Sequence, residues 1–302
     1  MTNEKKIGFI GLGNMGFPMA KNLLAKGYTV YGLDLNKDSE HRLAALGGKT
    51  GLTTASLVNE VDLIFTSLPT PQIAEAVFLG EDGIIQHCKK PTTLVDLSTI
   101  SPDVNRKVAK AAEENNLDYL GAPVSGSVSG AVNATLAIMV GGNKTTYDAV
   151  LPYLEVLGAN VFHVGDDPGA GTIVKLINNL MAGFHNQAVA EALTIAERAG
   201  LDKDIVYDIV NVSSGQSTLF TRNYKTFISQ DEYIDGAFAT ALLLKDLKLA
   251  KDYADSVHGK LPLSEKLIEF YESAVEEGYA DKDMSSVYVM IQEEINKQLQ
   301  EA

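Results

Sequence analysis

Short apolar runs alternate with helical patterns over the first half of the chain. Between residues 5 and 164, runs rich in β-branched and aromatic residues recur, and stretches with apolar residues three and four positions apart separate them. The runs are KIGFIGL, TVYGL, DLIFTSL, TTLVDLS, DYLGAPV, LAIMVGG and ANVFHVG. This alternation is typical of an open α/β sheet. We therefore predict an α/β protein whose N-terminal part is a doubly wound, mainly parallel sheet.

The pattern changes after about Gly169, where the strand-like runs stop. Glycines and a proline in GDDPGAGT mark the change, and only helical patterns follow. The predicted helices cover 171–199, 202–211, 216–229, 237–258 and 262–277, with a last helix after Met284. The sequence thus predicts two domains, an α/β domain at 1–165 and an all-α domain at 166–302.

Composition and charge narrow the class of protein. Of the 302 residues, 45% are hydrophobic, which is ample for a core in each domain. A net charge of −14 without a Lys/Arg-rich run argues against nucleic acid, whose phosphate backbone needs clustered cations. We see no leader and no apolar run of membrane-spanning length, and Cys88 is the single cysteine. These features predict a cytoplasmic protein with no membrane partner and no disulfide.

The segment IGFIGLGNMG carries the first recognisable chemistry. Gly11, Gly13 and Gly16 stand in GxGxxG spacing, directly after an apolar strand and before the helical pattern FPMAKNLLAKG. Gly11 permits the tight turn, Gly13 lets the backbone approach a pyrophosphate, and Gly16 lets helix and strand pack closely. The helix N-terminus adds free N–H groups for the anion. This context predicts a Rossmann-type dinucleotide-binding domain. The predicted cofactor-binding residues of the segment are Gly11, Leu12, Gly13, Asn14, Met15 and Gly16.

Asp34 indicates which dinucleotide is preferred. It ends the second predicted strand, where a carboxylate can accept both ribose hydroxyls of an adenosine. The same carboxylate repels a 2′-phosphate, and the next residues, Leu35 and Asn36, supply no arginine to hold one. We expect NAD as the cofactor and NADP as the poorer one.

Five segments together resemble the β-hydroxyacid dehydrogenase family. They are GFIGLGNMGFPMAKNLLAKG, DLSTISP, GAPVSGSVSGA, GAGTIVKLINN and KDLKLAKD, and they follow the family's order over essentially the whole chain. The family includes 3-hydroxyisobutyrate dehydrogenase, tartronate semialdehyde reductase and 2-(hydroxymethyl)glutarate dehydrogenase. The resemblance implies an NAD(P)-dependent enzyme whose C-terminal domain is similar to that of 6-phosphogluconate dehydrogenase and serves substrate binding and dimerisation.

Lys175 is a lone cation in a stretch suited to burial. Reduction of a carbonyl by a nicotinamide needs a proton donor near the carbonyl oxygen, and a desolvated lysine can give and take a proton. Asn179 lies four residues on, hence on the same helical face. The resemblance implies the same roles, Lys175 as the catalytic proton donor and acceptor and Asn179 in substrate binding. The alternative is a lysine that extends to solvent from a helix edge.

GAPVSGSVSGA follows a predicted strand and strings small residues together, which exposes backbone N–H groups suited to a carboxylate. The resemblance implies that Ser125, Gly126 and Ser127 form the substrate-carboxylate loop. The family usually has a second glycine where this chain has Ser127, which puts the backbone geometry there in question. The alternative is an ordinary glycine-rich crossover loop.

Further cofactor contacts follow from the resemblance. Thr99 closes the strand in DLSTISP, and Leu68 and Pro69 in SLPTP shape an apolar wall beside the nicotinamide. In FATALLLKDLKLAKD, we expect Phe238, Leu242 and Lys245 on one helical stripe. The family places Phe238 near the nicotinamide and Lys245 at the edge of the cofactor. Lys248 and Lys251 are predicted on a solvated face, paired with Asp252 and Asp255.

The sequence therefore predicts an NAD-dependent oxidoreductase that interconverts a small β-hydroxy carboxylic acid and its semialdehyde. The expected substrate is 3-hydroxyisobutyrate-like, with a hydroxymethylglutarate-like diacid or tartronate semialdehyde as alternatives. Gln216 stands where some relatives have an arginine, so a second substrate carboxylate would lack that anchor. A non-catalytic dinucleotide-binding module and an imine reductase are the alternatives of other classes. No His/Cys cluster has metal-ligand spacing. The long apolar helix at 171–199 predicts a homodimer or homotetramer.

Overall fold

The computed structural model of the chain describes residues 6–233 and 237–301. The chain divides into two compact units, residues 1–175 and 176–302, which we call unit 1 and unit 2. The division falls inside a helix, ten residues later than the boundary predicted from the sequence. The reason is that the first turns of this helix pack on the sheet of unit 1, whereas the sequence marks only where the helical pattern starts.

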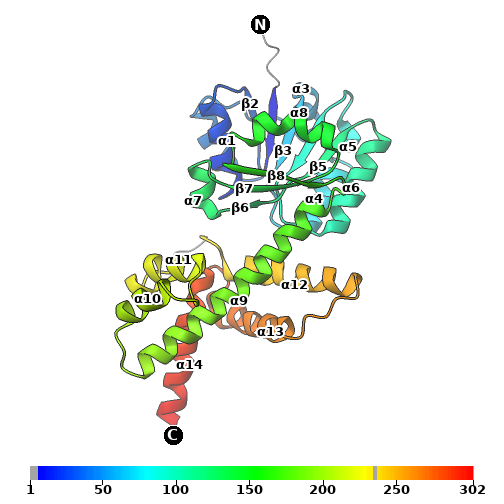
Figure 1. Cartoon of the computed structure of the whole chain (residues 1–302). Helices are drawn as coiled ribbons and strands as arrows, with labels where there is room; N and C mark the ends of the chain where they lie inside the picture. The colour runs from blue at the N-terminus through cyan, green and yellow to red at the C-terminus, as the bar shows by residue number, and fades with distance from the viewer. Residues whose placement is uncertain (1–5, 234–236, 302) are drawn as a thin grey trace. The chain divides into compact units, whose positions relative to one another are not determined.

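Unit 1 is built on one sheet, whose described residues form eight strands (Figure 1). The strands are β1 (Ile7–Ile10), β2 (Val30–Leu33), β3 (Leu63–Thr66), β4 (Thr93–Asp96), β5 (Asp118–Gly121), β6 (Val124–Ser125), β7 (Ala137–Gly141) and β8 (Asn160–Gly165). Their order is β2-β1-β3-β4-β5-β7-β6, with β8 paired to β7. The pairs among β1 to β5 are parallel, whereas β7 runs antiparallel to β5 and β6. The predicted α/β class with a mainly parallel sheet is thus confirmed.

The strand register brings the predicted cofactor segments to one edge of the sheet. Ile10 pairs with Leu33 and with Thr66, Thr66 pairs with Asp96, and Asp96 pairs with Gly121. The carboxyl ends of five parallel strands are therefore level, and the chain leaves each of them at the same edge. The order β2-β1-β3 reverses direction at β1, and such a reversal is where open α/β sheets bind their ligands.

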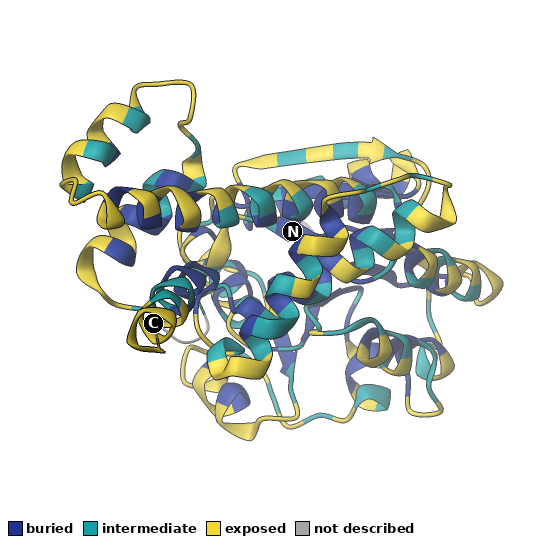
Figure 2. Cartoon of the chain, turned by 90° about the horizontal axis from the view of Figure 1, so that it is seen from below, coloured by how far each residue is buried: buried dark blue, intermediate teal, exposed yellow. Residues whose placement is uncertain are grey.

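Helices cover the sheet and turn their buried faces (dark blue) toward it and their exposed faces (yellow) toward solvent (Figure 2). They are α1 (Gly16–Ala25), α2 (Lys37–Ala44), α3 (Thr54–Glu60), α4 (Pro71–Leu79), α5 (Ile84–His87), α6 (Pro102–Glu114), α7 (Ser127–Val132) and α8 (Lys144–Leu154). Pro71 and Pro102 start α4 and α6, and Thr70 and Ser101 accept backbone N–H groups of the first turns, as Ncap residues do.

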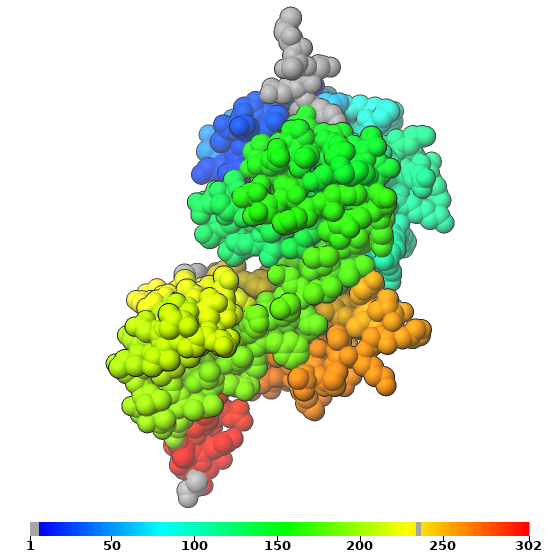
Figure 3. Space-filling model, in the orientation of Figure 1, coloured from blue at the N-terminus to red at the C-terminus, as the bar shows by residue number. Residues whose placement is uncertain are grey.

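The last strand, β8, is the outermost strand next to β7. It alternates exposed and intermediate residues and is visible as the banded yellow and teal arrow in Figure 2. In the space-filling view, the green segment that contains α8 and β8 covers the near face of unit 1 (Figure 3).

Helix α9 (Ala170–Arg198) begins in unit 1 and continues into unit 2. Its first turn lies so close to the sheet that a Cβ on Gly171 would come within 1.9 Å of the Met139 carbonyl oxygen. Gly169 is also close to its neighbours, because a Cβ there would lie 2.9 Å from Pro102 Cβ. The glycines of GAGT therefore serve close packing between the start of α9 and its neighbours in unit 1.

The described part of unit 2 is helical apart from one isolated bridge, and it has its own core. After α9 come α10 (Lys203–Asn211), α11 (Thr218–Thr226), α12 (Thr240–Ser256), α13 (Ser264–Ala274) and α14 (Val287–Glu301). The core contains Leu193, Leu243, Leu247, Tyr271 and Val287, all fully buried. The helices predicted from the 3.6-residue period are confirmed, with α11 and α12 shorter than expected.

Candidate active site

In the turn after β1, two of the three glycines are required by close backbone contacts, and the third borders open space. Gly11 has a φ of +92°, and a Cβ there would lie 2.2 Å from the Ser67 carbonyl oxygen. A Cβ on Gly16 would lie 1.9 Å from the Gly11 carbonyl oxygen. Gly13, in contrast, is exposed and has nothing within 4 Å of its Cβ position. The space beside Gly13, next to the start of α1, fits the approach of a pyrophosphate.

Asp34 follows β2 at the same edge and is oriented by backbone donors. The Leu12 N–H donates to Oδ2 at 2.5 Å, and the Asn36 N–H donates to Oδ1 at 2.7 Å. The carboxylate is thereby fixed against the glycine turn, with lone pairs left for further donors such as ribose hydroxyls. This arrangement is compatible with the adenosine side of a dinucleotide.

Two more predicted segments meet at the ends of β3 and β4. The Leu68 N–H donates to the Ser98 hydroxyl at 2.8 Å, which ties the SLPTP segment to DLSTISP. Thr99 is half-buried next to Ser98, and Pro69 is exposed. The hydroxyl of Ser98 therefore holds the loop, and the Ser101 hydroxyl caps the N-terminus of α6.

Asp96, which was not predicted as a functional residue, lies beneath these loops with no exposed surface. Its Oδ1 accepts from the Thr66 hydroxyl at 2.7 Å and from the Ser98 N–H at 3.0 Å. Burial raises the pKa of the Asp96 carboxyl, and the bonds from Ser98, Thr66 and Tyr119 oppose this rise. In the sequence, Asp96 could have been found as the acid that ends the strand-like run TTLVD.

A buried chain of hydrogen bonds runs from Asp96 to the start of α9. The Tyr119 hydroxyl lies 3.4 Å from Asp96 Oδ2 and accepts from Asn105 Nδ2 at 2.8 Å. Asn105 Oδ1 in turn accepts from the Thr172 hydroxyl at 2.7 Å. Thr172 and Lys175 are three residues apart on α9, so this chain fixes the helical turn from which Lys175 extends.

Lys175 and Asn179 lie one turn apart on α9, and both are buried. Lys175 is 8% exposed and Asn179 is 2% exposed. The alternative in which Lys175 extends freely into solvent is thus inconsistent with the structure. A lysine is rarely buried to this extent without a specific role, because the charged ammonium loses hydration there.

Asn179 is held by an acid that the sequence analysis missed. Its Nδ2 donates to Oδ2 of Asp246 on α12 at 2.5 Å, and its Oδ1 accepts from Asn178 Nδ2 at 3.0 Å. Asp246 is 3% exposed. Lys245 Nζ lies 3.1 Å from its Oδ1 and forms an ion pair with it that is not a hydrogen bond. Asp246 thus brings Asn179 and Lys245 together. In the sequence, Asp246 could have been found as an acid on the same helical face as the buried residues Leu243 and Leu247 of α12.

The predicted carboxylate loop is more regular than expected. Ser125 ends β6, and α7 begins at Ser127, so little of the segment is loop. Gly126 has a φ of +138° and Ser127 a φ of +60°. Ser127 therefore adopts the left-handed conformation that favours glycine, so the glycine expected from the resemblance would suit the same backbone. Gly126 and Ser127 are exposed, which leaves this turn accessible to a ligand.

The stripe predicted for Phe238, Leu242 and Lys245 is wrong at its first member. Helix α12 starts at Thr240, and Phe238 precedes it. The Phe238 N–H donates to Asp283 Oδ2 at 3.1 Å, and its carbonyl accepts from Met284 N at 2.9 Å. These bonds hold Phe238 in a bend beside residues 283–284, which the helical pattern could not reveal.

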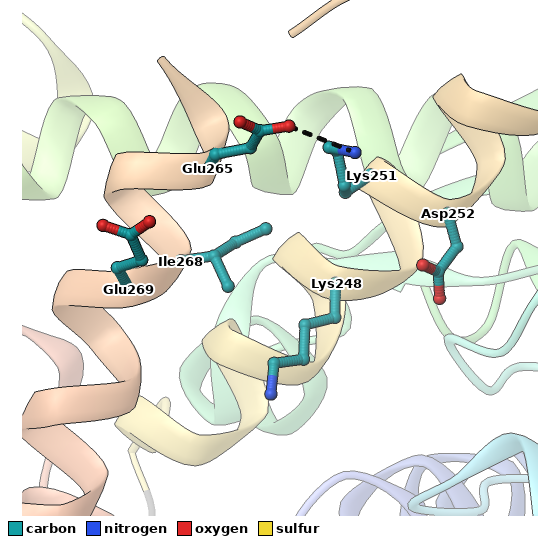
Figure 4. A pocket seen from close by; sticks show the side chains of 6 residues that line it. All are labelled: Lys248, Lys251, Asp252, Glu265, Ile268 and Glu269. Atoms are coloured by element: carbon teal, nitrogen blue, oxygen red, sulfur yellow. Dashed lines mark ion pairs between the residues drawn. The ribbon is translucent and has the colours of Figure 1, made fainter. Parts of the chain in front are cut away.

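The outer face of α12 carries charges, as predicted, but one partner differs. Lys251 pairs with Asp255 at 2.6 Å, whereas Lys248 pairs with Glu272 of α13 at 2.6 Å and not with Asp252. A shallow pocket of about 370 Å³ lies between α12 and α13 (Figure 4). It is lined by Lys248, Lys251, Asp252, Glu265, Ile268 and Glu269. Lys251 pairs with Glu265 in this pocket, whereas Lys248 and Glu269 pair with residues outside it. No predicted catalytic residue lines the pocket.

Within residues 6–233 and 237–301, no three His, Cys, Asp or Glu side chains are grouped so that they could hold a metal ion. None of the helices in the same ranges has the length and apolar character that crossing a membrane requires.

Known proteins match this chain over nearly its whole length. The family model described as the NAD binding domain of 6-phosphogluconate dehydrogenase matches residues 6–165. The model described as NAD-binding of NADP-dependent 3-hydroxyisobutyrate dehydrogenase matches residues 169–291. 2-(Hydroxymethyl)glutarate dehydrogenase of Eubacterium barkeri is 39% identical over 95% of both chains. A probable mitochondrial 3-hydroxyisobutyrate dehydrogenase of Dictyostelium discoideum is 38% identical over 95% of this chain and 91% of its own.

A solved structure agrees with these matches. Mycobacterium tuberculosis 3-hydroxyisobutyrate dehydrogenase, in a structure described with L-serine, superposes with a TM-score of 0.86 at 32% identity. The match covers 95% of this chain and 99% of that one. The fold and the site define an NAD(P)-dependent hydroxyacid dehydrogenase. The chain belongs to the β-hydroxyacid dehydrogenase family.

Proposed function

We propose that this enzyme uses NAD to interconvert a short β-hydroxy carboxylate and its semialdehyde, with Lys175 as the proton donor and acceptor. The observation that carries the proposal is the burial of Lys175 on α9, one turn from Asn179. Burial disfavours the charged form of an amine, so a buried lysine beside a substrate oxygen is suited both to giving and to taking a proton. A module that only binds a dinucleotide has no use for such a residue.

In the direction of reduction, Lys175 donates a proton to the carbonyl oxygen of the substrate. In the direction of oxidation, it takes the proton from the hydroxyl group. A bound nicotinamide supplies or accepts the hydride at the substrate carbon. The ammonium also stabilises the negative charge that grows on the oxygen, and this effect is strongest where water is excluded. Lys175 is thus the catalytic residue of the proposal.

The substrate carboxylate is assigned to the turn of Ser125, Gly126 and Ser127. Two features support this assignment, the left-handed backbone at 126–127 and the exposure of this turn. Asn179 is assigned to substrate binding, because its remaining Nδ2 hydrogen is a donor in a buried position. Asp246 is the positioning residue that fixes the Asn179 amide.

NAD is the proposed cofactor, with NADP as the poorer one. The support is the Asp34 carboxylate, which is oriented by the N–H groups of Leu12 and Asn36. Gly11, Gly13, Asn14, Met15 and Gly16 are assigned to the pyrophosphate side, and Leu68, Pro69, Thr99, Phe238 and Lys245 to the nicotinamide side. The tie between Leu68 and Ser98 supports a fixed wall on that side.

A 3-hydroxyisobutyrate-like acid is the proposed substrate. A hydroxymethylglutarate-like diacid is the second candidate, supported by the 39% identity to a dehydrogenase of that substrate. Gln216 is exposed and uncharged, which argues against an anchor for a second carboxylate at that position. Tartronate semialdehyde and L-serine complete the set of candidates, the latter because a similar structure is described with it.

The test is a panel of hydroxy acids assayed for NAD reduction. We expect 3-hydroxyisobutyrate to give a higher kcat/KM than 2-(hydroxymethyl)glutarate, L-serine and glycerate, the hydroxy acid whose oxidation gives tartronate semialdehyde, and NAD to give a higher kcat/KM than NADP. A preference for the diacid would transfer the proposal to the second candidate. Turnover of cyclic imines without turnover of any hydroxy acid would refute it.

A cytoplasmic homodimer or homotetramer remains part of the proposal. Its support is apolar surface on unit 2, since Ile205, Ile209 and Val212 are each more than half exposed and stand at spacings of four and three. Ile195 near the end of α9 is 69% exposed. Such a stripe is expected to be covered in an assembly. Light scattering of the purified protein measures the number of subunits directly.

A further inference from the structure

Glu40 is a buried acid that the proposed mechanism does not use. It lies on α2, three residues after Lys37, and is 3% exposed. Its Oε1 accepts from the Asp34 N–H at 3.0 Å and from Lys37 Nζ at 2.8 Å. Burial alone would raise the pKa of Glu40, but the bonds from Lys37 and from the Asp34 and Gly51 N–H groups hold it below its ordinary value. Glu40 is therefore a charged partner of both neighbours.

Lys37 is a cation beside the residue that selects the dinucleotide. Its ammonium also donates to the Asp34 carbonyl oxygen at 3.1 Å, while its side chain is 60% exposed. A cation at this place, just after the second strand of such a domain, is suited to pair with the 2′-phosphate of NADP(H). The Lys37 ammonium is instead held by Glu40 and by the Asp34 backbone.

We propose that Glu40 determines the choice of dinucleotide by two contacts: it fixes the Asp34 backbone, and it pairs with Lys37 and so denies that cation to a 2′-phosphate. This inference rests on the proposed preference for NAD and names a second residue that enforces it. The first contact keeps the Asp34 carboxylate directed at the ribose hydroxyls. The second contact neutralises a cation that would otherwise favour NADP(H).

Glu40→Gln separates the two contacts, because the amide oxygen still accepts from the Asp34 N–H but no longer carries a charge for Lys37. Dissociation constants for NADH and NADPH are measured by nicotinamide fluorescence, which needs no substrate. We expect the affinity for NADPH relative to NADH to rise about fivefold, the size of one exposed charge pair. Asp38→Asn is the control, since it removes one negative charge from the same exposed turn of α2 without touching Lys37, and it should change the ratio less than twofold.

Two further variants decide the outcome. In Glu40→Gln/Lys37→Met, the gain for NADPH should disappear, because no ammonium is left to release. Lys37→Met alone should not raise the affinity for NADPH relative to NADH, because it leaves the Glu40 charge unpaired and a carboxylate repels a 2′-phosphate. A rise would overturn the inference, and this variant decides the matter if Glu40→Gln fails to fold. A parallel change of both affinities in Glu40→Gln, or a gain for NADPH that survives in the double variant, would also overturn it. Tighter binding of NADPH than of NADH by the unmodified protein would refute the proposed NAD preference itself.

Discussion

Asn179 donates a hydrogen bond to Asp246, with 2.5 Å between Nδ2 and Oδ2, and both residues are at most 3% exposed. The two residues come from α9 and α12 and are 67 positions apart in the chain. A buried carboxylate is costly unless donors surround it. The buried Asp246 carboxylate therefore indicates that the protein needs the Asn179 amide in this one orientation.

Asp246→Asn is predicted to lower kcat/KM about tenfold or more, because a hydrogen bond to a charged group contributes roughly 1.5–3 kcal/mol. Steady-state kinetics with the best substrate of the panel provides the measurement. Asp252→Asn, an exposed change on the same helix, is the control and should retain full activity. Equal activity of the two variants would show that Asp246 does not position Asn179.

Thr172→Val is predicted to lower the free energy of unfolding by about 1–3 kcal/mol, because it leaves the buried side-chain oxygen Oδ1 of Asn105 without its hydrogen-bond donor. The same change should lower kcat more than it raises KM, since Thr172 fixes the helical turn that carries Lys175. Urea unfolding followed by circular dichroism gives the first value. Thr172→Ser keeps the hydroxyl and should recover most of both losses. If it recovers neither, the hydrogen-bond chain is not responsible.

The glycines of the first turn should differ in what they do. Gly16→Ala is predicted to destabilise the fold, because the new Cβ would lie 1.9 Å from the Gly11 carbonyl oxygen. Gly13→Ala should leave the melting temperature nearly unchanged, because nothing lies within 4 Å, and yet weaken NADH binding. Thermal melts and fluorescence titrations of both variants test the contrast. Unimpaired NADH binding by Gly13→Ala would place the pyrophosphate elsewhere.

The start of α9 should make stability depend on pH through Asp167. Arg106 Nη2 lies 2.7 Å from Asp167 Oδ2, and this bond holds the pKa of Asp167 below its ordinary value of 3.8. A lowered pKa in the folded state stabilises the protein above the unfolded value and loses this effect as the pH falls through the folded value. Asp167→Asn should therefore be less stable at pH 7, by at most about 1 kcal/mol for so exposed a pair. The difference should shrink as the pH falls below 3.8 and vanish once the pH is below the lowered pKa of the folded state. A difference that persists at low pH would contradict the assignment.

Features with local periodicity could be predicted from the sequence, whereas partners distant in the chain could not. The glycine spacing, the strands β1 to β5 and the long helix α9 follow from patterns within a few residues. The pairing of Asn179 with Asp246 joins two helices, and no spacing rule indicates it. The same holds for Lys248, whose partner is Glu272 on the next helix and not its neighbour on the same face.

Phe238 and Ser125 show that the local conformation of a residue can also differ from what the sequence pattern predicts. Phe238 continues the helical pattern of α12 but bonds to residues 283 and 284, so a tertiary contact overrides a local preference. Ser125 belongs to the two-residue strand β6, which is too short to show any alternation. Asp96 and Asp246 were visible only as acids at apolar positions, a signal that becomes informative once the fold is known.

The most direct test of the account is Lys175→Met, measured in parallel for NADH binding and for turnover of the best hydroxy acid. Lys248→Met, on the exposed face of α12, is the matched control and should behave as the unmodified enzyme. The account predicts that Lys175→Met binds NADH with unchanged affinity and loses about 10³-fold or more in kcat, the contribution of a proton donor together with its charge. Turnover within tenfold of the unmodified enzyme, with NADH binding intact, would contradict the central role of Lys175.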